Sequence, residues 1–221
     1  MAEDQILFYG KYMDANFWIE KWNNNEINFH QSQANPFLVQ HFAKLSLTKG
    51  KRIFLPLCGK TLDAAWLLHQ DYRVVGSELV EMAIKQLFEE LKVKPKITRR
   101  RDLKLYSANN LDIFVGDFFQ LQKEELGTVD AVYDRAALVA LPEVMRSLYT
   151  THLTEITNKA PQLLIVFEYD QKIMKGPPFS INDEEVLKHY QNSYKLKLLE
   201  NAEVIGGLKG QPAHEKVWLL N

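Results

Sequence analysis

Charged side chains that end apolar runs are the residues of this sequence that most directly indicate chemistry. Glu78 ends the run RVVGSE, and Asp134 with Arg135 ends AVYDR. A charged group flanked by apolar residues is seldom buried without a partner, so each of these either joins a structural network or faces a ligand. A carboxylate can bind a ligand ammonium or two sugar hydroxyls, and a guanidinium can bind a ligand carboxylate. Glu78 can alternatively be the acidic residue that favours the start of the next helix.

The loop PLCGKT, residues 56–61, lies between an apolar run and a helical pattern. Residues 54–61 match the phosphate-binding loop G-x-x-x-x-G-K-[ST] everywhere except at its first glycine. Pro56 also removes one of the backbone amides that such a loop turns toward a phosphate. The sequence therefore disfavours a nucleoside-triphosphate site. Gly59 then serves a close approach of the backbone and the turn into the helix.

Two more turns carry candidate residues. Asp117 precedes two phenylalanines in VGDFFQL, so its carboxylate or a backbone amide can meet an adenine edge beside Phe118; the alternative is a turn aspartate with core phenylalanines. The stretch 170–181 contains GPP and is longer than a typical connection between a strand and a helix. This stretch is either a lid over a site or an ordinary irregular loop.

Composition excludes several classes of function. The chain has 221 residues, of which 46% are hydrophobic and 25% charged, with a formal net charge of −1. No broad electrostatic field is available to hold nucleic acid or an anionic membrane, and the basic run 92–101 is interpreted as a solvated loop after a helix. Cys58 is the only cysteine, so we expect no disulfide and no metal site. Without a secretory signal or a long apolar run, we expect a cytoplasmic monomer.

Alternating strand and helix patterns predict the fold class. From residue 52, short β-branched runs alternate with helical periodicity, which indicates an α/β protein with a mostly parallel sheet. The expected strands are 52–57, 73–78, 112–115, 129–134, 162–169, 195–204 and 216–220. The expected helices are 60–70, 80–92, 143–158 and 182–192. The short connection between the last two strands implies an antiparallel pair, so we predict a Rossmann-like, seven-stranded, mostly parallel sheet with an antiparallel final strand and helices on both faces.

An aromatic-rich N-terminal segment precedes this alternation. FWIEKWNNN predicts a short helix from Phe17, and a second helix is expected over 36–47. We therefore divide the chain into an arm and helical cap over the active site, 1–48, and a single α/β domain, 49–221. Asn109 and Asn110 indicate a hairpin turn before the third strand. In such sheets ligands bind beyond the carboxyl ends of the strands, near the point where the strand order reverses.

These motifs together resemble the thiopurine S-methyltransferase family of class I S-adenosylmethionine-dependent methyltransferases, in its bacterial form. The shared motifs, in order from about residue 17 to 180, are FWIEKW, NFHQ, FLPLCGK, VVGSEL, DFFQL, YDRAALVAL and GPPF. The resemblance implies S-adenosylmethionine as cofactor and S-adenosylhomocysteine as product. It also implies methyl transfer to the sulfur of an aromatic or heterocyclic thiol.

The family pattern and the strand-end reasoning together give the predicted site. The cofactor-binding residues are Trp18, Trp22, Leu57, Gly59, Glu78, Asp117, Phe118, Asp134 and Arg135. The residues expected to bind the methyl acceptor are Phe29, His30, Arg135, Pro178 and Phe179. No residue is assigned with certainty as a catalyst, and His30 and Arg135 are the candidates for positioning the acceptor.

The expected chemistry is an in-line displacement. A sulfonium methyl is already activated, so the protein must chiefly align the nucleophile with the S–CH3 bond and exclude water. Aromatic thiols are acidic enough that a dedicated strong base is not required. Two alternatives remain open: methyl transfer to small nucleophiles such as selenite, tellurite, halide or thiocyanate, and an adenosyl-binding module without turnover. The expected partner is a small thiol or chalcogen compound, with no nucleic acid and no membrane.

Overall fold

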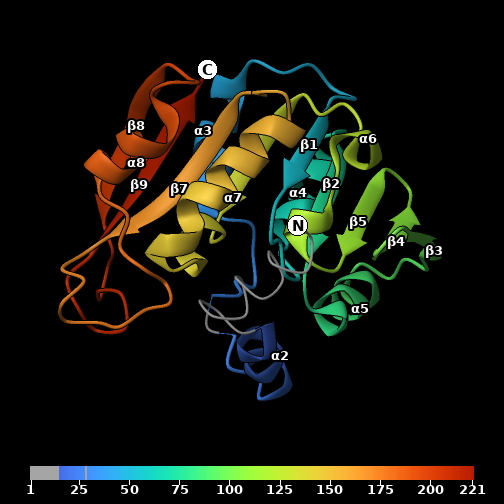
Figure 1. Ribbon diagram of the computed structural model, residues 1–221, viewed down its shortest axis with the longest axis horizontal. Coiled ribbons are helices and arrows are strands. Elements are labelled where there is room, and N and C mark those ends of the chain that lie inside the picture. Colours follow the sequence, from blue (N-terminus) through green and yellow to red (C-terminus); the bar gives the residue numbers. More distant parts are fainter. Residues whose placement is uncertain (1–14, 28) are drawn as a thin grey trace.

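The computed structural model describes residues 15–27 and 29–221, which form one nine-stranded sheet in the order β3-β4-β5-β2-β1-β6-β7-β9-β8 (Figure 1). The strands are β1 (Arg52–Leu55), β2 (Arg73–Glu78), β3 (Lys96–Arg100), β4 (Leu103–Ala108), β5 (Leu111–Val115), β6 (Ala131–Arg135), β7 (Gln162–Glu168), β8 (Leu196–Glu203) and β9 (His214–Leu220). The helices are α2 (Ala15–Asn23), α3 (Pro36–His41), η1 (Phe42–Leu45), α4 (Asp63–His69), α5 (Glu81–Glu90), η2 (Phe118–Gln120), α6 (Lys123–Leu126), η3 (Leu138–Ala140), α7 (Glu143–Ile156) and α8 (Asp183–Tyr190).

The five central strands, β5-β2-β1-β6-β7, are parallel, which confirms the predicted fold class. The chain passes from β1 to β2 on one side and places β6 on the other side of β1. The strand order therefore reverses at β1, and the crevice beyond its carboxyl end is the expected place for a ligand.

Two hydrophobic cores cover the two faces of the sheet. Alternate residues of each central strand point to opposite faces, so Phe54 joins one core while Ile53 and Leu55 join the other. Helices α7 and α8 pack on the first face, and α3, α4 and α5 on the second. Because both faces are covered, the central strands are apolar along most of their length.

The sheet has two more strands than the seven predicted. The basic run 92–101, interpreted from sequence as a solvated loop, instead contains β3, which pairs antiparallel with β4 and extends the sheet beyond β5. Four of the five residues of β3 are exposed, so the strand has no apolar alternation to reveal it. The hairpin turn at Asn109 and Asn110 is confirmed, with positive φ values of 41° and 67°.

The other edge of the sheet is the antiparallel pair that the sequence predicts. Strand β9 runs antiparallel to β7 and separates it from β8, which in turn runs antiparallel to β9. This order brings the start of β9 to the edge where the parallel strands end. Glu215 consequently lies opposite Phe167, near the carboxyl end of β7.

The N-terminal helices divide into two groups. Leu38, Phe42 and Leu45 of α3 and η1 are buried in the core of the sheet. Helix α2 instead lies apart from the sheet in Figure 1, and its Trp22 packs in a small separate cluster with Val80. None of the helices in the described part of the chain is both long and apolar enough to cross a membrane.

Candidate active site

A cavity of about 1120 Å³ lies at the carboxyl ends of the parallel strands. Its walls come from α2 and the residues after it, the loops after β1 and β6, the end of β2, the 176–178 stretch and the start of β9. Drug-sized ligands occupy roughly 300–1,000 Å³ in protein pockets, so this cavity has room for a nucleoside-sized cofactor together with a small second substrate.

The loop after β1 approaches the cavity by way of unusual backbone conformations. Leu57 and Gly59 have φ values of 46° and 54°, and the amide of Cys58 donates to the Ser77 carbonyl at 2.9 Å. A Cβ on Gly59 would lie 3.2 Å from the ring of Trp22. Glycine is therefore required at 59 both by its conformation and by the close approach of the cap.

Glu78 ends β2 directly behind this loop. One carboxylate oxygen accepts the amide of Gly59 and the other accepts that of Val80, both at 2.8 Å. Burial raises the pKa of Glu78, while these backbone hydrogen bonds oppose the shift. A carboxylate offers about four lone-pair positions, so the two oxygens can still accept hydroxyl donors from the cavity.

Three aromatic rings form the cap side of the cavity. Trp18 and Trp22 of α2 both meet Phe29 edge to face, with ring centroids 5.9 and 5.8 Å apart. The carbonyl of Phe29 accepts a hydrogen bond from Arg135 Nη1 at 3.0 Å. The cap is therefore joined to the end of β6 through a residue that itself lines the cavity.

At the end of β6, the side chains of Asp134 and Arg135 point to opposite faces of the sheet, although the sequence analysis grouped them as one candidate pair. Tyr133 and Arg135 line the cavity, but Asp134 does not. Asp134 is fully buried on the opposite face, where it accepts hydrogen bonds from the Tyr149 hydroxyl at 2.7 Å and the Leu138 amide at 3.3 Å. Burial raises its pKa to about 6, against the effect of these hydrogen bonds. The expected direct contact of Asp134 with a ligand is not supported by this position, because neighbours on a strand face opposite sides.

Asp117 and Phe118 both border the cavity, yet each also has a structural role. The Asp117 carboxylate accepts the amide of Phe119 at 3.0 Å and caps η2, and burial raises its pKa. Phe118 is only 4% exposed and its ring packs against Tyr149 with centroids 5.2 Å apart. The structural role is therefore observed, and a contact of this turn with adenine stays a prediction.

His30 lines the cavity on the cap side. Burial lowers its pKa, and the nearby Lys60 cation lowers it further. The imidazole is consequently neutral near pH 7 and has one nitrogen able to accept a hydrogen bond. Lys60 itself pairs with Glu90 at 2.8 Å, as a residue near a helix start and not as a phosphate ligand.

The stretch after β7 contributes Pro177 and Pro178 to the cavity wall. Their carbonyls accept hydrogen bonds from Lys209 Nζ at 2.8 Å and from the Tyr169 hydroxyl at 2.6 Å. Phe179, expected to bind the acceptor, does not line this cavity; its ring lies against the Arg146 guanidinium at 5.3 Å. Its role is thus to anchor this stretch.

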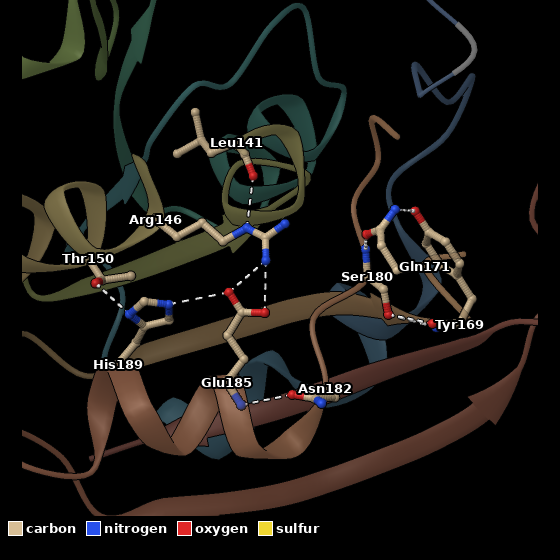
Figure 2. A network of polar contacts seen from close by, with 9 residues as sticks. All are labelled: Leu141, Arg146, Thr150, Tyr169, Gln171, Ser180, Asn182, Glu185 and His189. Carbon is tan, nitrogen blue, oxygen red and sulfur yellow. Dashed lines mark hydrogen bonds and ion pairs between the residues drawn. The ribbon is translucent and has the colours of Figure 1, made fainter. Parts of the chain in front are cut away.

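A polar network holds the anchor in place (Figure 2). Arg146 on α7 donates to both oxygens of Glu185 on α8, at 2.6 and 2.8 Å, and to the carbonyl of Leu141 at 2.8 Å. Ser180 bonds to the backbone of Tyr169 in both directions, at 2.8 and 2.9 Å. The first set of contacts joins α7 to α8, and the second joins Tyr169 to Ser180 across the 169–181 stretch.

The polar cavity residues that sequence reasoning missed include Asp63, Tyr133 and Glu215. Asp63 is buried and accepts the Asn35 amide at 2.7 Å and the Tyr133 hydroxyl at 3.0 Å. Glu215 has one enclosed carboxylate oxygen with no hydrogen-bond partner in the described protein. Only the strand order brings these residues together, so no local pattern marks them.

No group of three or more metal-ligating side chains occurs among the described residues.

Comparison with known proteins gives consistent matches. Residues 13–219 match the family model described as thiopurine S-methyltransferase (TPMT). Proteins named thiopurine S-methyltransferase from Xanthobacter autotrophicus and Teredinibacter turnerae are each 50% identical to this chain over 210 residues, covering 94% and 95% of this chain and 99% and 98% of theirs.

Solved structures show the same fold at low sequence identity. The 1,6-didemethyltoxoflavin-N1-methyltransferase of Burkholderia thailandensis, solved with S-adenosylhomocysteine, superposes with a TM-score of 0.64 at 13% identity, covering 94% of this chain and 87% of that one. An S-adenosylmethionine-dependent methyltransferase from Anabaena variabilis gives 0.60 at 15% identity, covering 94% and 95%.

Proposed function

The chain belongs to the thiopurine S-methyltransferase family, and from that premise we propose that it moves the methyl group of S-adenosylmethionine to the sulfur of an aromatic or heterocyclic thiol. The observation that supports this most directly is the arrangement of Glu78 and the 57–59 loop beneath the aromatic cap. One large cavity joins them to a second polar region near β6 and β9.

The residues present fit the cofactor. The remaining lone pairs of Glu78 suit two ribose hydroxyls, and the backbone of Leu57 and Gly59 can lie against the methionine chain. Arg135 places a cation by the methionine carboxylate or the acceptor, and its Nε is enclosed without a partner in the described protein. Asp117 and Phe118 border the region left for the adenine. We do not propose Asp134 as a direct contact.

The acceptor lies on the other side of β1 in this proposal. Phe29, His30 and Pro178 line that part of the cavity together with Arg135. We propose residues 15–31 as the cap, because α3 and η1 belong to the main core.

S-adenosylmethionine supplies a methyl group on a sulfonium, with a thioether as the leaving group. The chain's own residues align the acceptor sulfur and exclude water. The faces of Trp18 and Trp22 favour a cationic centre beneath the cap. His30, neutral at pH 7, can accept a hydrogen bond from a thiol. An acceptor that binds as its thiolate needs no strong base.

Glu78→Gln tests this assignment by calorimetry with S-adenosylmethionine. We expect the dissociation constant to rise by about 10- to 100-fold, because hydrogen bonds to a charged group contribute roughly 1.5–3 kcal/mol. Glu81→Gln is the matched control: Glu81 lies three residues further on and bonds to Tyr106 and Lys104 outside the cavity. An unchanged affinity in a folded Glu78→Gln protein would reject the ribose assignment.

A further inference from the structure

The acceptor side of the cavity has a polar floor that the cofactor assignment does not use. Glu78 ends β2, and the 57–59 loop follows β1, so the cofactor occupies this side of the switch point. Strands β6, β7 and β9 lie on the other side. Glu215, the second residue of β9, lies there on the same face of the sheet as Tyr133 and Arg135, and all three line the cavity.

Glu215 differs from the other acidic residues of the cavity wall. Glu78 accepts two backbone amides, and Asp63 accepts the Asn35 amide and the Tyr133 hydroxyl. Asp117 caps η2. In Glu215, by contrast, Oε1 is enclosed and has no hydrogen-bond donor within the part of the protein that the structure describes. An enclosed, unpaired carboxylate oxygen on a residue that lines the cavity favours a ligand that brings a donor.

The surrounding charges keep this carboxylate available as a proton acceptor. Burial raises the pKa of Glu215, while the Arg135 guanidinium and the Asn35 amide lower it. A carboxylate with a raised pKa binds a proton more readily than an exposed one. The cation at Arg135 lies on the same floor and stabilises the ionised form of Glu215 that can take up a proton.

The chemistry of heterocyclic thiols supplies a matching donor. A thiopurine exists mainly as a thione, with C=S beside a ring N–H. As the sulfur takes the methyl group, the S–CH3 bond forms and the sulfonium S–CH3 bond breaks, its electron pair going to the cofactor sulfur. The ring then regains its aromatic thioether form when the N–H proton leaves and that electron pair forms C=N.

We propose that Glu215 accepts a hydrogen bond from the ring N–H of a thione acceptor and takes up its proton as the methyl group is transferred. This inference rests on the proposed function. Glu215 thereby selects heterocyclic thiones over thiols that have no ring N–H.

Glu215→Gln tests the inference, since the amide keeps the size and one acceptor oxygen but cannot take the proton. Methyl transfer from S-adenosylmethionine is measured with 6-mercaptopurine, which has the ring N–H, and with thiophenol, which has none. We expect kcat for 6-mercaptopurine to fall by about 100-fold, a typical effect of removing a general base. The value of kcat/KM for thiophenol and the affinity for S-adenosylmethionine stay within about threefold.

Glu203→Gln is the matched control, because Glu203 is an exposed residue of β8 paired with His214 beside Glu215. It should leave both reactions unchanged. Equal losses with both acceptors in Glu215→Gln would reduce Glu215 to a structural residue, and undiminished turnover of 6-mercaptopurine would remove it from the reaction. A wild-type protein that methylates neither compound would instead reject the proposed function, which separates the two failures.

Discussion

At the scale of single residues, Asp134 and Arg135 show how strand geometry divides neighbours. Arg135 reaches the cavity and the cap, whereas Asp134 is fully buried against α7. The sequence marks both as charged residues at the end of an apolar strand, but it does not say which face of the sheet is the ligand's. That information comes only from the tertiary packing, because α7 covers the face on which Asp134 lies.

The burial of Asp134 predicts a pH dependence of stability. Its pKa is about 6 in the folded protein and near 3.8 when unfolded. Between these values the native state holds the proton more tightly, so the free energy of unfolding falls as pH rises through the window. We expect the free energy of unfolding of wild type, relative to that of Asp134→Asn, to fall by about 3 kcal/mol from about pH 3 to about pH 7.

Urea unfolding of both proteins at several pH values measures this difference. Groups other than Asp134 titrate in both proteins, so they cancel. A difference that is independent of pH would mean that Asp134 stays ionised throughout, with its hydrogen bonds outweighing its burial.

The site was predictable only where local sequence carries a signal. Glu78, Arg135, Gly59 and the two tryptophans lie in motifs with recognisable spacing, and all of them reach the cavity. Asp63 and Glu215 lie in no such motif, because Asp63 begins α4 and Glu215 lies in β9, and only the tertiary fold brings these two elements to one cavity. Pro178 lies in the cavity wall as expected, whereas the side chain of the next residue, Phe179, lies outside the cavity against Arg146.

At the scale of elements, helix α2 packs against the rest of the described protein mainly through aromatic side chains that line the cavity. Its Trp22 is buried against Val80 and Phe29, and its Trp18 meets Phe29, whereas Ile19 is 39% exposed. The helix spans nine residues, too short to be stable in water without such packing. Its position therefore depends on a few aromatic contacts.

Trp18→Ala tests the cap. We expect the affinity for S-adenosylmethionine to fall by about tenfold, since a cation against an aromatic face contributes roughly 0.5–2 kcal/mol. Ile19→Ala, the next residue on the exposed side, should leave affinity within about twofold by calorimetry. Equal effects of the two changes would show that α2 acts through its own stability and not through contact with the ligand.

Among the strands, the central ones were predictable because burial on both faces gives continuous apolar runs. The edge was not. Strand β3 is almost entirely exposed and carries Lys96, Arg99 and Arg100. Charged residues on an edge strand discourage pairing with other chains, so the property that hides β3 in the sequence is the one that protects the edge.

At the scale of the whole molecule, the Arg146–Glu185 pair joins two helices that pack on the same face of the sheet. It connects α7 to α8 (Figure 2). The Phe179 ring lies against the same Arg146 guanidinium. The side chains are 6% and 17% exposed, so this is a partly buried ion pair. Such a pair contributes little against an apolar replacement, but loss of one partner is costly.

Arg146→Met is therefore expected to lower the free energy of unfolding by about 3 kcal/mol, and Arg146→Met with Glu185→Met to recover most of it. Urea unfolding of the two single variants and the double variant measures the coupling. Trypsin cleavage after Lys172 or Lys175 should also speed up in Arg146→Met and return to normal in the double variant. A double variant as unstable as the sum of the single ones would show that the two residues act independently.

The order of β7, β9 and β8 has a consequence for the newly made chain. Strand β8 emerges from the ribosome before β9, yet its only neighbour in the finished sheet is β9. Until β9 is made, the outer edge of β7 presents the unpaired backbone of an almost wholly apolar strand, Gln162–Glu168. Such an edge pairs readily with foreign strands. The interval between the synthesis of β7 and that of β9 is thus when the nascent protein is most open to aggregation, and when a chaperone that shields strand edges has most to offer it.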